Sequence, residues 1–110
     1  MIILPCQAKD AARILEIEGA SFSDPWSLGM IEGELTSKAS LCVKAEEEGN
    51  LIGYGFVRLA LPEAELLRIA VAENERSKGV GGALLERLIT LAEERRAEEM
   101  FLEVRERWFV

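Results

Sequence analysis

The chain has 110 residues, 20 acidic and 13 basic side chains, a formal net charge of −7, two cysteines and no histidine. This length allows one domain, and an apolar share of 49% is ordinary for a protein with a packed core. The absence of histidine excludes Ser-His-Asp and Cys-His catalytic systems, and the negative charge argues against a general nucleic-acid binder, which needs a basic face.

The first predicted elements are a short strand and two helices. Residues 2–4 are apolar and Pro5 ends the run, which is typical of a strand. Asp10 precedes apolar residues at helical spacing, so we expect a helix that Asp10 caps and that residues 19–25 end. Ser27 is the expected cap of a second helix, which two internal glycines weaken.

The middle of the chain predicts an antiparallel hairpin followed by a buried strand. Apolar and polar residues alternate over residues 41–46, and residues 51–59 form a longer apolar run after an acidic turn. Within the second run, Gly53 and Gly55 indicate a bulge or a close approach by another backbone. Residues 66–71 are mostly apolar, as expected of a strand that is buried on both faces.

The last predicted elements are a long helix and a strand. Residues 79–96 carry an apolar stripe at helical spacing, and residues 100–105 alternate in a strand pattern. Residues 1–110 are therefore expected to form a single domain in the order strand, two helices, three strands, helix, strand. This order predicts an α+β fold whose sheet contains one strand-turn-helix-strand crossover.

The cysteine count and the chain start indicate the compartment. Cys6 and Cys42 are too few for a disulfide framework, and without histidine they do not complete a tetrahedral zinc site. We therefore expect free thiols in a reducing compartment and no metal. The first residues do not have the pattern of a signal peptide, and no run is long enough for a membrane span. These features predict a cytoplasmic protein that binds neither nucleic acid nor a membrane.

The turn before the long helix carries the clearest functional pattern. It reads Arg76-Ser77-Lys78-Gly79-Val80-Gly81-Gly82. Glycines let backbone N–H groups approach an anion, and a helix N-terminus adds partial positive charge. Arg76 and Lys78 bring two cations to the same place. The turn therefore predicts a cradle for a diphosphate group, and the alternative is a glycine-rich turn that only connects two elements.

Three segments together resemble one enzyme family. Arg76, Gly79 and Gly81 form the pattern Arg-x-x-Gly-x-Gly, which resembles the coenzyme A signature of the GNAT N-acetyltransferases. Residues 24–27 (Asp-Pro-Trp-Ser) and 101–105 (Phe-Leu-Glu-Val-Arg) resemble the ribosomal-protein-alanine (RimI-type) branch of that family. The resemblance implies the GNAT fold, a mixed and mainly antiparallel sheet with helices on both faces. It also implies acetyl transfer from acetyl-CoA to a protein N-terminal α-amine, such as that of a ribosomal protein, by direct attack of the amine.

The resemblance implies roles for particular residues. Those implied to hold acetyl-CoA are Ile69, Ala70, Val71, Arg76, Ser77, Lys78, Gly79, Val80, Gly81 and Gly82. One N–H of the strand at residues 69–71 is expected to polarise the thioester carbonyl. Glu103 matches the general base, and the alternative is a solvent-facing carboxylate or one paired with Arg105. Phe22 and Trp26 are expected to wall the peptide site, with core packing as the alternative.

The chain departs from the family pattern at its end. Trp108 stands where the family has asparagine, and the expected domain lacks the usual last helix, which bears the general-acid tyrosine, and two strands. Tyr54 lies on another strand and is expected to pack. These departures predict slow turnover and a homodimer through an open sheet edge, unless the tail folds back on its own core. Two other functions stay open: a coenzyme A-binding or interaction module without catalysis, and an acetyltransferase of small amines.

Overall fold

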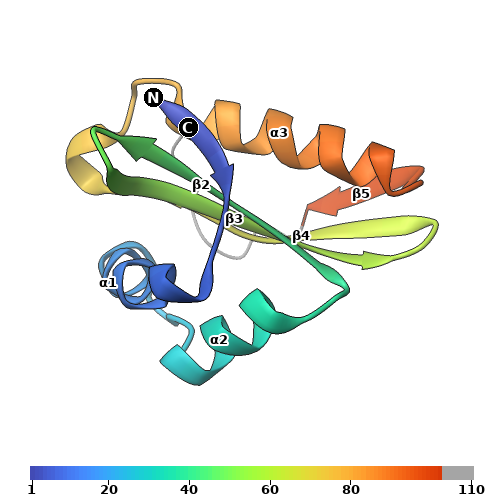
Figure 1. The fold of residues 1–110 in the computed structure, drawn as a ribbon, viewed down its shortest axis with the longest axis horizontal. Coiled ribbons are helices and arrows are strands. Elements are labelled where there is room, and N and C mark those ends of the chain that lie inside the picture. The colour runs from blue at the N-terminus through green and yellow to red at the C-terminus, as the bar shows by residue number, and fades with distance from the viewer. Residues whose placement is uncertain (103–110) are drawn as a thin grey trace.

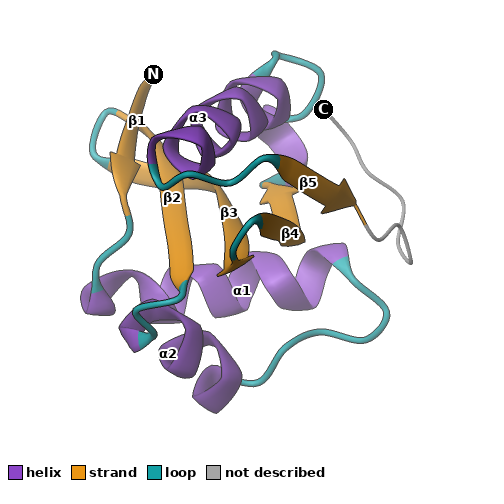
Figure 2. Ribbon diagram, turned by 90° about the vertical axis from the view of Figure 1, so that its right-hand side faces the viewer, coloured by secondary structure: helices purple, strands orange, loops and turns teal. Residues whose placement is uncertain are grey.

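The structure, a computed structural model, describes residues 1–102, which form one sheet with helices on both faces (Figures 1 and 2). The sheet order is β1-β2-β3-β4-β5, with β4 and β5 parallel and the other neighbours antiparallel. The elements are β1 (Ile2–Pro5), η1 (Ala8–Asp10), α1 (Ala11–Ser21), α2 (Leu28–Thr36), β2 (Ser40–Glu47), β3 (Asn50–Ala60), β4 (Glu63–Val71), η2 (Glu73–Glu75), α3 (Val80–Glu94) and β5 (Glu99–Leu102). The predicted α+β fold and element order are thereby confirmed.

Each face of the sheet has its own apolar core. Helix α3 covers one face, and α1 and α2 cover the other (Figure 2). The buried α3 side chains in the first core are Val80, Leu84, Leu88 and Ala92. The largest buried side chains of the second core are Ile14, Ile31, Tyr54 and Phe56. No helix within residues 1–102 is long and apolar enough to cross a membrane.

Some local expectations differ from the structure. Asp10 stands at the start of α1, but its carboxylate accepts from the Gln7 N–H at 2.7 Å instead of capping the helix. The same carboxylate lies 2.9 Å from Nζ of Lys44, which is only 3% exposed although its strand pattern suggested a solvent-facing side chain. Ile89 is 41% exposed at the border of the α3 stripe, and β4 begins at Glu63, three residues before the predicted start. These differences arise because contacts with other elements determine which side chains are buried and where a strand begins. The local sequence pattern does not contain those contacts.

Two glycines of β3 let α3 pack closely on the sheet. A Cβ added at Gly55 would lie 2.7 Å from Cδ1 of Leu88, and one at Gly53 would lie 3.1 Å from the carbonyl oxygen of Ala70. Leu88 is fully buried, so it has little room to move. The close contacts at these glycines are thus mainly with α3 side chains, and the register also shows the predicted bulge, since Ala45 pairs with Gly53 and Glu46 with Leu51.

Replacing Gly55 by Ala is expected to destabilise the protein by about 1–3 kcal/mol, because the methyl group overpacks the core against Leu88. The matched control is Gly33→Ala in α2, where an added Cβ meets no atom within 4 Å. That change should raise stability by up to about 1 kcal/mol through helix propensity. Urea unfolding measures both, and equal midpoints for the two variants would contradict the packing described here.

Candidate functional site

The turn from β4 into α3 presents backbone amides that have no hydrogen-bond acceptor among the described residues. Ser77 and Gly79 have positive φ angles of 67° and 83°, which turn the chain sharply before Val80 begins the helix. The amide of Ala83 bonds to the carbonyl oxygen of Gly79 at 3.1 Å, as the first turn of α3 closes. The amides of residues 80–82 precede that bond and have no acceptor within the helix. With the positive end of the α3 dipole, these amides form a site suited to an anion.

The two cations of this turn, Arg76 and Lys78, differ in their contacts and exposure. The Arg76 guanidinium donates from Nε to the carbonyl oxygen of Val71 at 3.0 Å and from Nη2 to Oγ of Ser21 at 3.1 Å. It therefore holds the turn against β4 and the end of α1. The Lys78 side chain is 61% exposed, with Nζ 3.4 Å from Oε1 of Glu75. Lys78 is thus the cation that can swing toward a ligand at the amides.

The outer surface of the turn is open. A Cβ built on Gly79 or Gly82 would meet no atom within 4 Å, and both glycines are exposed. Val80 and Gly81 are buried instead, since they face the core beneath α3. A bulky anion can therefore approach the amides from the side of Gly79 and Gly82.

A bulge in β4 separates two differently paired parts of that strand. Phe56 pairs with Arg68 and Val57 with Leu66, so Leu67 is an extra residue in β4. The described pairing of β4 with β5 extends to the pair of Leu66 with Leu102. Beyond the bulge, no strand within residues 1–102 pairs with the outer edge of β4.

The backbone direction along this open edge follows from the register. Ala72 donates its N–H to the carbonyl oxygen of Ile52 at 2.8 Å, so its backbone faces β3. Because N–H directions alternate along an antiparallel strand, the N–H groups of Ile69 and Val71 point to the outer edge and that of Ala70 to β3. Of the residues predicted to hold the cofactor arm, Ile69 and Val71 therefore present backbone groups at the outer edge of β4, whereas the backbone of Ala70 faces β3.

These features fit a ligand with a diphosphate and an extended, amide-bearing arm. The amides at the start of α3 suit the diphosphate, and the open edge of β4 can pair with an arm as it would with another strand. Acetyl-CoA has both parts. The residues of this chain therefore fit the ligand that the sequence resemblance implies.

The predicted acceptor residues, Phe22 and Trp26, lie on the other face of the sheet around Arg68. Cζ of Arg68 is 4.2 Å from the Phe22 ring centroid and 5.1 Å from that of Trp26. Both rings are half-buried, and Trp26 also packs at 5.3 Å on Phe56. Each ring therefore packs against the protein interior and leaves part of its surface accessible, and the role in walling a peptide site stays a prediction.

A buried carboxylate below these rings was not predicted as part of the site. Glu18 has no exposed surface, and it accepts from the Tyr54 hydroxyl at 2.6 Å and from the Trp26 N–H at 2.7 Å. Nε of Arg68 lies 3.4 Å from the same carboxylate. The sequence signal was available, since Glu18 falls on the apolar face of its helix and Arg68 in a buried strand. Tyr54 packs as predicted, and its hydroxyl also has this partner.

Burial raises the pKa of Tyr54 well above its usual range, and the negative charge of Glu18 and their hydrogen bond add to the effect. Tyr54 is the only tyrosine, so phenolate absorbance reports it alone. We expect no phenolate in the native protein at about pH 11, where the unfolded chain is mostly ionised. The folded state keeps the Tyr54 proton where the unfolded chain loses it. The contribution of Tyr54 to the free energy of unfolding is therefore constant below about pH 10 and falls by about 1.4 kcal/mol per pH unit above it. An ordinary titration of the native protein would contradict the buried pair.

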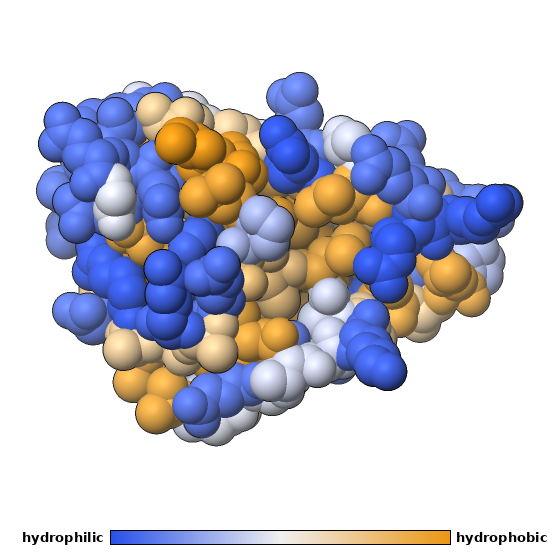
Figure 3. All heavy atoms as spheres, in the orientation of Figure 1, coloured by the Kyte–Doolittle hydropathy of each residue, from blue (hydrophilic) through white to orange (hydrophobic). Residues whose placement is uncertain are grey.

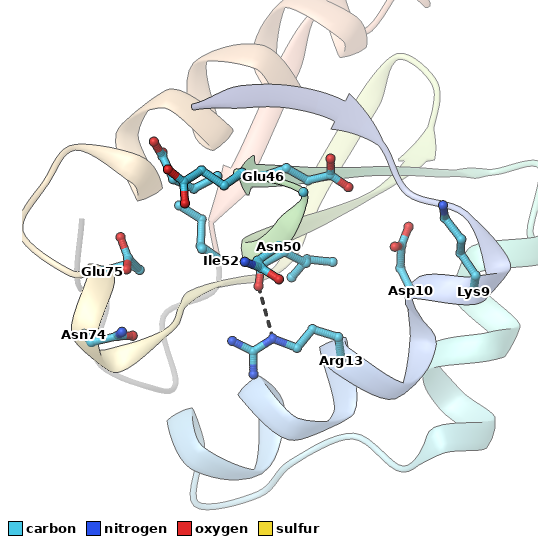
Figure 4. Close-up of a pocket in the computed structure, with 12 residues that line it drawn as sticks. Lys9, Asp10, Arg13, Glu46, Asn50, Ile52, Asn74 and Glu75 are labelled. Atoms are coloured by element: carbon cyan, nitrogen blue, oxygen red, sulfur yellow. Dashed lines mark hydrogen bonds between the residues drawn. The ribbon is translucent and has the colours of Figure 1, made fainter.

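A cavity of about 590 Å³ lies elsewhere, between α1, the β2–β3 turn and η2 (Figure 4). Arg13 donates from Nε to the carbonyl oxygen of Leu51 at 3.1 Å within it. Its charged lining residues are Lys9, Asp10, Arg13, Glu46, Glu47, Glu48 and Glu75. Hydrophilic side chains cover this end of the molecule, on the left in Figure 3. Five carboxylates against two cations make the cavity unsuited to a phosphate-bearing ligand.

The predicted general base, Glu103, lies outside the described residues, as do Arg105 and the tail from Trp108. Leu102, the last described residue, pairs with Leu66 immediately before the β4 bulge.

Comparisons with known proteins agree on one family. The profile of the Acetyltransferase (GNAT) family matches residues 11–107. A [ribosomal protein bS18]-alanine N-acetyltransferase of Haemophilus influenzae is 33% identical over 105 residues, which cover 96% of this chain and 71% of the relative. A putative enzyme of the same name from Bacillus subtilis is 29% identical over 88% of this chain and 65% of its own.

Solved structures give the same result for the fold. The ribosomal-protein-S18-alanine N-acetyltransferase of Escherichia coli superposes with a TM-score of 0.87 at 29% identity, over 94% of this chain and 66% of that one. Rv2747 of Mycobacterium tuberculosis, solved in complex with CoA and NLQ, has a TM-score of 0.83 at 16% identity, over 93% and 63%. The chain thus spans about two thirds of the length of these relatives.

Proposed function

Because the chain belongs to the acetyltransferase (GNAT) family, we propose that it transfers an acetyl group from acetyl-CoA to the N-terminal α-amine of a protein. The observation that carries this proposal is the juxtaposition of amides at the start of α3 with a bulged edge of β4, both without a backbone partner among residues 1–102. Acetyl-CoA bound there would supply the acetyl group as an activated thioester.

The chain's own groups supply three functions in this proposal. The amides of residues 80–82, with Lys78 nearby, bind the diphosphate. The outward N–H groups of Ile69 and Val71 bind the arm, and one of them donates to the thioester carbonyl as negative charge develops on its oxygen. Such backbone donors need no histidine, which agrees with the composition.

The amine must lose a proton before it attacks, since an α-amino group has a pKa near about 8. We propose Glu103 as the base that removes it, on the strength of its place in the segment 101–105 that resembles the ribosomal-protein-alanine branch. The coenzyme A thiol has a pKa of roughly 8.5, so it can leave as a thiolate without a general acid, although more slowly.

We propose a protein N-terminus beginning with alanine as the acceptor. The names of the relatives from H. influenzae and E. coli describe alanine acetylation on a ribosomal protein. Phe22 and Trp26 present half-buried rings beside β4, where they can wall an extended peptide. The homodimer expected from the sequence stays a prediction.

The test is thiol release from acetyl-CoA with three acceptors: an Ala-starting peptide, the same peptide with a blocked N-terminus, and a small polyamine. We expect release with the unblocked peptide only, and a loss of roughly 10²–10⁴-fold in Glu103→Gln. Glu99→Gln is the matched control, because it makes the same carboxylate-to-amide change at an exposed position of β5. Acetyl-CoA binding without release would identify a binding module, and release with the polyamine alone would identify a small-amine enzyme.

A further inference from the structure

The segment from Phe22 to Trp26 connects α1 to the start of α2, and its described contacts converge on one buried ion pair. Glu18, on the last turns of α1, accepts from the Trp26 N–H at 2.7 Å and has no exposed surface. Arg68, on β4, donates from Nη2 to the carbonyl oxygen of Asp24 at 2.7 Å and lies against both aromatic rings. The ion pair therefore contacts the beginning, middle and end of the segment.

Arginine is suited to these contacts in a way that lysine is not. One guanidinium approaches Glu18 with Nε at 3.4 Å, donates from Nη2 to the carbonyl oxygen of Asp24, and has its Cζ 4.2 Å and 5.1 Å from the ring centroids of Phe22 and Trp26. A lysine ammonium is a compact charge with neither a planar face nor a fixed pair of donors. Stability alone does not explain the pair, since buried ion pairs are often no more stabilising than apolar side chains of similar volume.

Arg68 also stands at the junction of the two substrate regions. It is the first residue after the bulge at Leu67, and its neighbour Ile69 presents its N–H at the open edge of β4. The side chain of Arg68 thus contacts the segment proposed to wall the acceptor, while the next backbone group belongs to the proposed donor site. A shift of this side chain would change the distance between the acceptor segment and the donor site.

We propose that Arg68 is a positioning residue that fixes the Phe22–Trp26 segment against β4, so that the acceptor amine meets the thioester in a productive orientation. This role rests on the proposed function for its chemical meaning. Misplacement of reacting groups by about 1 Å can lower a rate by roughly a hundred-fold. A residue that holds the Phe22–Trp26 segment in place therefore has a measurable effect on the rate.

The test variant is Arg68→Lys, which keeps a positive charge beside Glu18 and is expected to fold. Arg87→Lys, on the exposed face of α3, is the matched control. The first readout is hydrogen exchange at the Trp26 amide, which bonds directly to Glu18. We expect exchange to accelerate about ten-fold or more in Arg68→Lys, with no change at the amides of α3 and none in the control.

The second readout is binding of an Ala-starting peptide in the presence of unacetylated coenzyme A, followed by kinetics with acetyl-CoA. We expect kcat/KM for the peptide to fall roughly ten-fold to a hundred-fold, through a lower kcat together with a higher peptide Kd, and the KM for acetyl-CoA to change less than about two-fold. The proposal is overturned if the Trp26 amide of Arg68→Lys exchanges at the wild-type rate, or if the variant binds the peptide with an unchanged Kd. If the wild-type protein neither binds the peptide nor releases thiol, the proposed function fails, and with it the acceptor role of Arg68.

Discussion

Replacing Gly82 by Asp is expected to weaken acetyl-CoA binding by roughly a hundred-fold or more. The new carboxylate would stand among the amides at the start of α3, close to the proposed diphosphate. Two like charges about 5 Å apart near a protein surface repel by about 3 kcal/mol, which corresponds to this factor. Isothermal titration calorimetry measures the loss.

The same substitution should not harm the fold, which separates binding from stability. Gly82 is exposed, and an added Cβ meets no atom within 4 Å. An acidic side chain in the first turn of a helix stabilises it by about 0.3–1 kcal/mol, so Gly82→Asp should melt no lower than the wild type. Gly82→Asn, which has the same shape without the charge, is the control and should lose much less affinity. Equal affinities for Gly82→Asp and Gly82→Asn would contradict an anion site at this turn.

Replacing Glu18 by Ala is expected to destabilise the protein by about 3–5 kcal/mol, because it leaves the buried side of Arg68 without its counter-charge. It also removes the acceptor of the Tyr54 hydroxyl and of the Trp26 N–H. The midpoint of urea unfolding measures the change.

Glu16→Ala on the same helix is the matched control for that experiment. The Glu16 side chain is 70% exposed and makes only a 4.0 Å contact with Arg13, so its removal should change stability by less than about 0.5 kcal/mol. A small effect at both positions would mean that Glu18 does not hold the surrounding elements together.

The fold was largely predictable because local patterns and tertiary packing agree in most elements. The stripe of α3, the β2–β3 hairpin and the cap at Ser27, whose Oγ accepts from the Met30 N–H at 3.2 Å, follow from spacing and turn chemistry. The burial of Lys44 did not follow from its strand pattern, because its partner Asp10 comes from a different element. The bulge at Leu67 was also missed, since residues 66–71 carry no glycine or proline that would mark an irregular strand.

The candidate site was predictable only in part, for a similar reason. Glycines and a helix start are local signals, so the amide turn could be identified from the sequence. The orientation of Arg76 could not, because its partners Val71 and Ser21 lie on separate elements. The contact between Glu18 and Arg68 likewise joins α1 to β4. Both charges were visible as exceptions in apolar patterns, but only the fold shows that they meet.

The most direct measurement is an amide chemical-shift titration of the protein with acetyl-CoA. We expect the perturbed amides to be those of residues 77–82 and the outward N–H groups of Ile69 and Val71. Perturbations confined to the acidic cavity between α1 and the β2–β3 turn, or no saturable shifts at all, would contradict the central claim that the β4–α3 turn and the open edge of β4 form the acetyl-CoA site.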